Sequence, residues 1–116
     1  MYQVKSSQPS SKPVSPHLFN TDKEAKLLVT RACSLTGFTE DEIVYGRKHR
    51  FSLLRYVMYY ILRQGGATFQ EISNSIGNVH HATVMGGNKK IQELIYIDRE
   101  VKEIYNQLHH GTSDNK

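Results

Sequence analysis

Apolar residues recur along this chain with the period of an α-helix. The clearest segment spans about residues 50–64, where Leu54, Val57, Met58 and Ile61 occupy positions i, i+3, i+4 and i+7. Residues at these spacings lie on one face of a helix, so this segment is predicted to be the central core helix. An aromatic residue one turn earlier extends the same face towards the N-terminus.

Five other segments carry weaker versions of this pattern. The residues that define them are Leu27, Leu28, Arg31, Ala32 and Leu35 in the first, Ile43 and Val44 in the second, Phe69, Ile72 and Ile76 in the third, Val84, Ile91, Leu94 and Ile95 in the fourth, and Val101, Ile104, Tyr105 and Leu108 in the last. No segment alternates convincingly with period two, which would be the sign of a strand. The pattern therefore predicts an all-α domain, a compact unit of about five to six helices.

The predicted helices have recognisable start and stop signals. Three Thr-x-x-Glu sequences have capping-box spacing, namely Thr21–Glu24, Thr39–Glu42 and Thr68–Glu71. In a capping box the Thr hydroxyl and the Glu carboxylate each accept a hydrogen bond from the other residue's backbone amide. Glycines close the helices that precede them, at Gly37, Gly46 and Gly65-Gly66. The last two helices are predicted at about 80–95 and 98–108.

Composition divides the 116 residues into three parts. Residues 1–19 are rich in Ser, Pro and Lys and are expected to form a flexible arm. Residues 20–108 are expected to form one helical domain, and residues 109–116 a disordered tail. The chain has no apolar run near the ~18 residues of a membrane span and no secretory signal. Its one cysteine, Cys33, is expected to be a buried thiol, which agrees with a cytoplasmic location.

Basic residues concentrate in one segment of the chain. The net charge is +4, yet residues 46–63 contain five Arg and Lys residues and no acidic residue. These five are Arg47, Lys48, Arg50, Arg55 and Arg63. Such a stripe is typical of a protein that docks on phosphates. A solvated basic helix face is the alternative interpretation.

Residues 68–84, TFQEISNSIGNVHHATV, have the layout of a helix-turn-helix. A helix with spaced apolar residues is followed by a glycine corner, where positive φ is often needed, and by a second helix. In DNA-binding proteins the first turn of that second helix meets base edges in the major groove. His80, His81 and Thr83 offer short donors and acceptors there, and Ala82 could touch a thymine methyl group. Two short packed helices of a plain bundle would give the same pattern.

A longer ordered set of motifs extends from Asp41 to Leu94, about 54 residues without gaps. It consists of Asp41-Glu-Ile-Val44, Gly46-Arg-Lys-His-Arg50, Arg55, Met58, Tyr59, Glu71-Ile72, Gly77, His81-Ala-Thr-Val84 and Lys89-Lys-Ile91. In this order and spacing the segment resembles the C-terminal DNA-binding domain of the bacterial replication initiator DnaA. That family's signature usually reads Asp-His-Thr/Ser-Thr-Val, followed by Arg/Lys-Lys-Ile.

The resemblance implies a Trp-repressor-like helical fold that binds double-stranded DNA as one unit. It implies a role in replication initiation or its regulation, a protein partner in a replication complex, and a location at the bacterial nucleoid. The basic loop would contact the backbone or minor groove, the recognition helix would contact bases or phosphates, and its later lysines would be phosphate contacts or solvated charges. The predicted DNA-binding residues are Arg47, Lys48, Arg50, Arg55, His80, His81, Ala82, Thr83, Lys89 and Lys90.

The chain also departs from the family pattern. His80 stands where the family has Asp, Ala82 where it has Thr, Asn78 where it has the second glycine of the corner, and Val79 where it has Arg. These positions help the family to read sequence, so the departures leave open whether a standard DnaA box is recognised. Gly86-Gly87 inside a helix costs roughly 1 kcal/mol per residue against Ala, which predicts close packing by a neighbouring helix.

Other functions are less well supported by the residues. No metal or cofactor is expected, because the histidine pairs are adjacent instead of four apart and no catalytic set assembles, so an enzyme is not predicted. The initiator's ATPase loop, GxxxxGK[ST], is absent. Tyr56, Tyr59 and Tyr60 could stack on single-stranded bases, but such residues are more often core edges. A protein-interaction module on a helix-turn-helix scaffold and a transcriptional regulator of a mobile element remain alternatives.

Overall fold

The computed structural model describes residues 20–113, and side chains as far as residue 109. This part of the chain is all-helical, as predicted. The six helices are α1 (Thr21–Thr36), α2 (Glu40–Tyr45), α3 (His49–Gln64), α4 (Phe69–Ser75), α5 (His81–Ile97) and α6 (Arg99–Ser113). The arm predicted at residues 1–19 lies outside the described residues. None of the described helices has the length and apolar character needed to cross a membrane.

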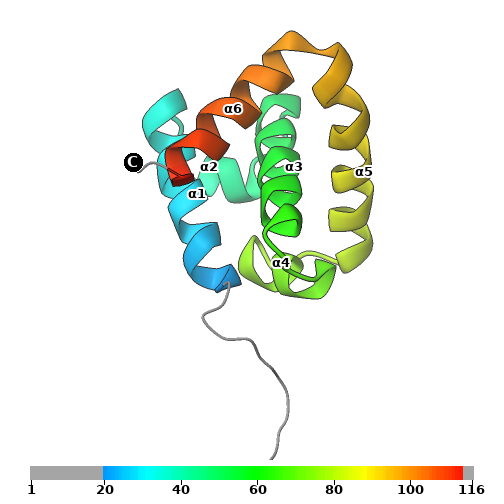
Figure 1. Ribbon diagram of the computed structural model, residues 1–116. Coiled ribbons are helices and arrows are strands. Elements are labelled where there is room, and N and C mark those ends of the chain that lie inside the picture. The colour runs from blue at the N-terminus through cyan, green and yellow to red at the C-terminus, as the bar shows by residue number, and fades with distance from the viewer. Residues whose placement is uncertain (1–19, 114–116) are drawn as a thin grey trace, which may run out of the picture.

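α3 is the central element and contacts each of the other five helices (Figure 1). The apolar face predicted for it is confirmed, since all of Phe51, Leu54, Val57, Met58 and Ile61 are buried. In Figure 1 α3 stands between α1 and α5, with α4 at one end and α6 crossing in front. Elements far apart in the sequence therefore share one core around a single helix.

The buried face of α1 differs from the predicted one. Leu27 and Leu35 are 42% and 47% exposed, whereas Val29 and Ala25 are buried together with Leu28 and Ala32. The first capping box was also misplaced by one residue: the N-cap is Asn20, whose Oδ1 accepts a hydrogen bond from the Lys23 amide at 3.1 Å. Asn is at least as good an N-cap as Thr, so the helix begins one residue earlier than predicted.

The other two predicted capping boxes are confirmed. The Thr39 amide donates to Glu42 Oε1 at 2.9 Å, and the Glu42 amide donates to Thr39 Oγ1 at 3.1 Å. At the start of α4 the same pair of bonds joins Thr68 and Glu71, at 2.8 and 3.1 Å. These reciprocal bonds fix where α2 and α4 begin, which in turn positions the loops that follow them.

α6 is longer than predicted. The helix continues to Ser113, so residues 109–113 are helical instead of forming part of a disordered tail; residues 114–116 lie outside the described residues. Leu108 is fully buried, and the rings of Tyr105 and His109 stack with centroids 5.1 Å apart. Burial of Leu108 attaches α6 to the core near the predicted end, and the Tyr105–His109 stacking lies within the helix itself.

The two glycines within α5 have different environments. A β-carbon at Gly87 would lie 2.5 Å from Cδ1 and 2.9 Å from Cε1 of Tyr56 on α3, so the predicted close packing is found there. A β-carbon at Gly86 would meet no atom within 4 Å, and the residue is exposed. Only Gly87 is therefore explained by helix packing.

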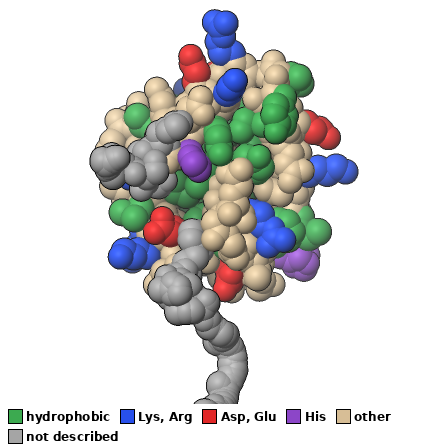
Figure 2. Space-filling model, in the orientation of Figure 1, with side chains coloured by type: hydrophobic (Ala, Val, Ile, Leu, Met, Phe, Trp, Pro, Cys, Tyr) green, Lys and Arg blue, Asp and Glu red, His purple; other side chains and the backbone are tan. Residues whose placement is uncertain are grey.

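Several large apolar side chains of the described residues stay exposed. They are Leu27, Leu35, Tyr45, Met85, Tyr96 and Ile97. In the space-filling view, hydrophobic side chains gather over the upper half of the visible face, bordered by charged side chains (Figure 2). Lys and Arg side chains are dispersed over this face, so it does not present one continuous basic patch.

Candidate nucleic-acid interface

The basic loop places its three cations at the start of α3. Arg47, Lys48 and Arg50 are all exposed, and Lys48 is the N-cap residue of the helix. No side chain caps this helix N-terminus, and its first turn contains no acidic residue. By contrast, an Asn, Thr or His side chain caps each of α1, α2, α4 and α5, and Asp98 accepts hydrogen bonds from the amides of the first turn of α6.

Two structural features hold this loop in place. The Gly46 amide donates to the Glu42 carbonyl oxygen at 2.8 Å, and a β-carbon at Gly46 would overlap that oxygen and the Phe51 ring. The Phe51 ring meets Phe38 edge-to-face with centroids 5.0 Å apart, and the Arg50 guanidinium lies 5.8 Å from the Phe38 centroid. Arg50 is thus exposed but oriented by an aromatic pair.

The corner between α4 and α5 has the backbone conformation that its sequence predicts. Gly77 and Asn78 have positive φ values of 76° and 50°. Asn tolerates this left-handed conformation better than most residues, so Asn78 can replace a glycine at the corner at low cost. α4 and α5 pack against each other across it.

His80 begins α5 as its N-cap. The Ala82 amide donates to His80 Nδ1 at 3.1 Å, so the imidazole has to carry its proton on Nε2 to serve as this acceptor. The ring of His81 stacks on that of His80, with centroids 4.7 Å apart. His80 therefore supplies a side-chain cap at this position and presents an exposed imidazole at the start of the helix.

The outer face of α5 continues this surface. His81, Ala82 and Thr83 are exposed in the first turn, and Lys89 and Lys90 are exposed two turns later. Ala82, Gly86 and Lys89 follow one another at spacings of four and three residues, which places them along one side of the helix. Because the middle of this row has no side chain, another surface can approach the helix backbone there.

A direct contact joins the basic loop to the corner. A β-carbon at Gly77 would lie 3.4 Å from Val44 Cγ1 and 3.5 Å from the Val44 carbonyl oxygen, so the two backbones run close together. Arg47 and His80 each lie three residues further along, at most about 11 Å from that contact. The distance between Arg47 and His80 is therefore shorter than one turn of the duplex, which is ~34 Å.

Arg55 is less exposed than the other predicted cations of this segment. Its Nη1 donates to the Ile43 carbonyl oxygen at 2.8 Å and its Nη2 to Ser52 Oγ at 3.2 Å, in a partly buried position. The guanidinium joins α2 to α3 and is already committed within the fold. Arg63, at the other end of α3, donates to the Ala67 carbonyl oxygen at 3.0 Å and lies over the Phe69 ring.

The three tyrosines of α3 pack against other parts of the protein, and only Tyr59 is fully buried. Tyr59 is 1% exposed, Tyr56 packs on Gly87, and the Tyr60 ring lies 5.5 Å from that of Tyr105. Burial raises the pKa of Tyr59 above its ordinary value, although the neighbouring Arg55 guanidinium opposes this shift. Of the three rings, only those of Tyr56 and Tyr60 are partly accessible for stacking on single-stranded bases.

Sequence reasoning missed two contributors to this surface. Phe38 orients Arg50, and the only signal for it was an aromatic residue directly before the capping box at Thr39. The exposure of Gly86 had no signal, because both glycines of the pair look alike in sequence. Within the described side chains, no three His, Cys, Asp or Glu residues gather in a way that could hold a metal ion.

Comparisons of the chain with protein-family models, with curated proteins and with solved structures give no match. The function therefore has to be inferred from the geometry of the loop and of α5, together with the sequence motifs.

Proposed function

We propose that this protein binds double-stranded DNA through the basic loop and the start of α5. The observation that carries the proposal is the N-terminus of α3, which lacks a side-chain cap and is surrounded by Arg47, Lys48 and Arg50. The unpaired amides of a helix N-terminus and the helix dipole both favour an anion. Three exposed cations at the same place add the charge that a phosphate backbone requires.

The start of α5 would supply sequence discrimination. His81, Ala82 and Thr83 are exposed on the first turn of a 17-residue helix, the position from which recognition helices contact base edges. Lys89 lies further along the same side and would contact a phosphate. Phosphate contacts would provide most of the affinity and base contacts most of the specificity.

The contact between Val44 and Gly77 supports joint use of both parts. It keeps the loop and the corner within one duplex turn, so the two can engage adjacent grooves of one DNA segment. Following the resemblance to the DnaA domain, we assign this binding to replication initiation or its regulation. Identification of the preferred duplex tests that assignment, because a role linked to DnaA predicts a site related to the DnaA box.

The first experiment measures affinity for a random-sequence duplex by fluorescence anisotropy at several salt concentrations. Log K should fall linearly with log salt, with a slope of about −0.9 per phosphate contacted. Arg47→Ala and Arg50→Ala should each weaken binding to all duplexes similarly and reduce the slope by about one contact. Lys26→Ala, which removes the same charge from an exposed position on α1, is the matched control and should change little.

The second experiment selects preferred sites from random duplexes with the wild type, Thr83→Ala and His81→Ala. Each α5 variant should relax preference at one or two base positions, with about 1–3 kcal/mol of discrimination lost at each. Absence of duplex binding at low salt, or binding that does not depend on salt, would rule the proposal out. In that outcome the helical scaffold would be better explained as a protein-interaction module.

A further inference from the structure

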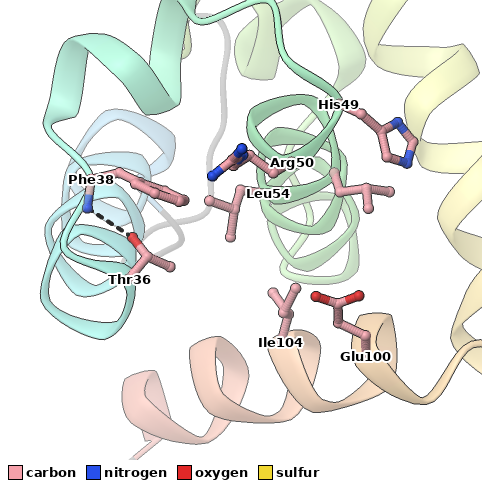
Figure 3. Close-up of a pocket in the computed structure, with 8 residues that line it drawn as sticks. Thr36, Phe38, His49, Arg50, Leu54, Glu100 and Ile104 are labelled. Atoms are coloured by element: carbon pink, nitrogen blue, oxygen red, sulfur yellow. Dashed lines mark hydrogen bonds between the residues drawn. The ribbon is translucent and has the colours of Figure 1, made fainter.

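A cavity lies beside the basic loop, on the side away from α5. It has a volume of about 490 Å³ and opens between the end of α1, the first half of α3 and the first half of α6 (Figure 3). The apolar lining comes from Phe38, Leu53, Leu54 and Ile104. Ligand sites for small molecules usually have volumes of about 300–1,000 Å³ and are lined mainly by apolar side chains.

Two opposite charges lie at the cavity. Arg50 projects from α3 towards Phe38, while Glu100 and Ile104 project from α6 towards α3 (Figure 3). Arg50 is held near the Phe38 ring, which limits the positions of its guanidinium. The cavity thus presents a planar cation with several donors near one side and a carboxylate acceptor on another, with apolar walls between them.

We propose that this cavity binds a small amphipathic carboxylic acid with an apolar body and a hydrogen-bond donor at its far end. The ligand carboxylate would pair with Arg50, whose guanidinium matches a carboxylate in a bidentate geometry. The apolar body would lie against Leu54 and Ile104, and the donor would reach Glu100. A simple fatty acid fits less well, because it offers nothing to the Glu100 carboxylate.

Arg50 belongs both to this cavity and to the proposed DNA-binding loop. A ligand carboxylate on Arg50 would withdraw that cation from a phosphate, so ligand and duplex should weaken each other's binding by the same factor. This second step rests on the proposed function, whereas ligand binding itself does not. The cavity would then serve as a regulatory site that adjusts the affinity of the loop for DNA.

The test adds 3-(4-hydroxyphenyl)propionate, the probe, to the full chain in the absence of DNA. Binding is monitored by methyl NMR. Saturable shifts are expected at Leu53, Leu54 and Ile104. The amide 3-(4-hydroxyphenyl)propionamide lacks the charge, and 3-phenylpropionate lacks the donor; each should bind about tenfold more weakly. Shifts that are equal for the acid and its amide, or absent at millimolar probe, would overturn the proposal.

Two charge-matched variants separate the cavity from the loop. Arg50→Gln should weaken probe binding about tenfold, whereas Arg47→Gln, which lies in the same loop but does not line the cavity, should leave it unchanged. Glu100→Ala should remove the advantage of the hydroxyphenyl probe over 3-phenylpropionate. Circular dichroism melts of all three variants identify any loss of folding, and an equal effect of Arg47→Gln and Arg50→Gln on the probe would refute the site.

DNA affinity is then measured with and without saturating probe. The regulatory step is supported if the probe lowers the DNA affinity of the wild type but does not change that of Arg50→Gln. Unchanged affinity in a protein that binds both duplex and probe would overturn the regulatory step but leave the site standing. Probe binding by a protein that binds no duplex would instead refute the proposed function alone.

Discussion

The contrast between the two glycines of α5 gives a sharp test of the packing described above. Gly87→Ala would bring a β-carbon to 2.5 Å from Cδ1 of Tyr56, whereas Gly86→Ala would place one in open space. Both variants add the same methyl group to the same helix, one residue apart. Their difference in stability therefore isolates the contact with Tyr56.

The expected magnitude follows from two opposing terms. Replacement of a helical glycine by alanine raises the free energy of unfolding by about 0.8–1.0 kcal/mol when nothing else changes. At Gly87 the Tyr56 ring would have to move by about 1 Å to restore a normal separation of ~3.5 Å. Tyr59 limits that movement, because it is buried and its ring centroid is 6.0 Å from that of Tyr56. Overpacking of this kind costs about 1–3 kcal/mol.

Gly86→Ala is therefore expected to be stabilised by about 1 kcal/mol, and Gly87→Ala to be less stable than Gly86→Ala by about 1–3 kcal/mol. Urea denaturation followed by circular dichroism at 222 nm measures both free energies of unfolding. In thermal melts the midpoint temperatures of the pair should differ by roughly 4–8 °C per kcal/mol. Tyr56→Leu in the Gly87→Ala background should recover part of the loss. Equal stability of the two alanine variants would refute the close packing of Tyr56 on α5.

Three further predictions concern individual side chains. His80→Ala should lose about 1 kcal/mol of stability, while His80→Asn, whose side-chain oxygen can take over the cap, should lose much less. Equal melting of the two variants would contradict the capping role of His80 Nδ1. Arg55→Met should lower the free energy of unfolding by about 1–3 kcal/mol, because the Ile43 carbonyl oxygen loses its donor. Arg47→Met should change it by no more than about 0.5 kcal/mol. Similar melting of the two variants would show that the Arg55 hydrogen bond contributes nothing to stability. The pKa of Tyr59 is raised above its ordinary value of 10.0, mainly by burial, so the unfolded chain releases this proton first as the solution becomes alkaline. Stability should be fully present below pH 10 and fall as the pH rises through the folded-state pKa, and Tyr59→Phe should show a shallower fall; a wild-type melting temperature that stays constant from pH 9 to 11 would contradict this.

The local signals in the sequence were sufficient to predict most of the fold. Thr39 with Glu42, and Thr68 with Glu71, form the predicted capping boxes because the bonds involved join residues only three positions apart. The start of α1 was misplaced because Asn20 and Thr21 are both good N-caps, and only the folded backbone selects between them. The length of α6 depended on packing against the core, which periodicity does not report.

The environments of several residues at the candidate site depend on contacts with distant parts of the chain. Arg55 lies in the basic segment, but its role depends on the Ile43 carbonyl oxygen, twelve residues away on another helix. The inward orientation of Tyr56 depends likewise on Gly87. The cavity beside Arg50 could not be predicted, because it is formed by α1, α3 and α6 together, and sequence spacing carries no information about their separation.

The contact of Val44 with Gly77 has a consequence for the energetics of binding. Either the loop or the start of α5, acting alone, would hold DNA weakly. If both parts bind DNA as proposed, their short and ordered connection would make them a bivalent ligand, and the second attachment would be intramolecular once the first had formed. Effective concentrations for short tethers reach the millimolar range, so the combined affinity can exceed that of either part by a factor of about 10²–10⁴. A small van der Waals contact that touches no DNA would then set the avidity of the whole protein.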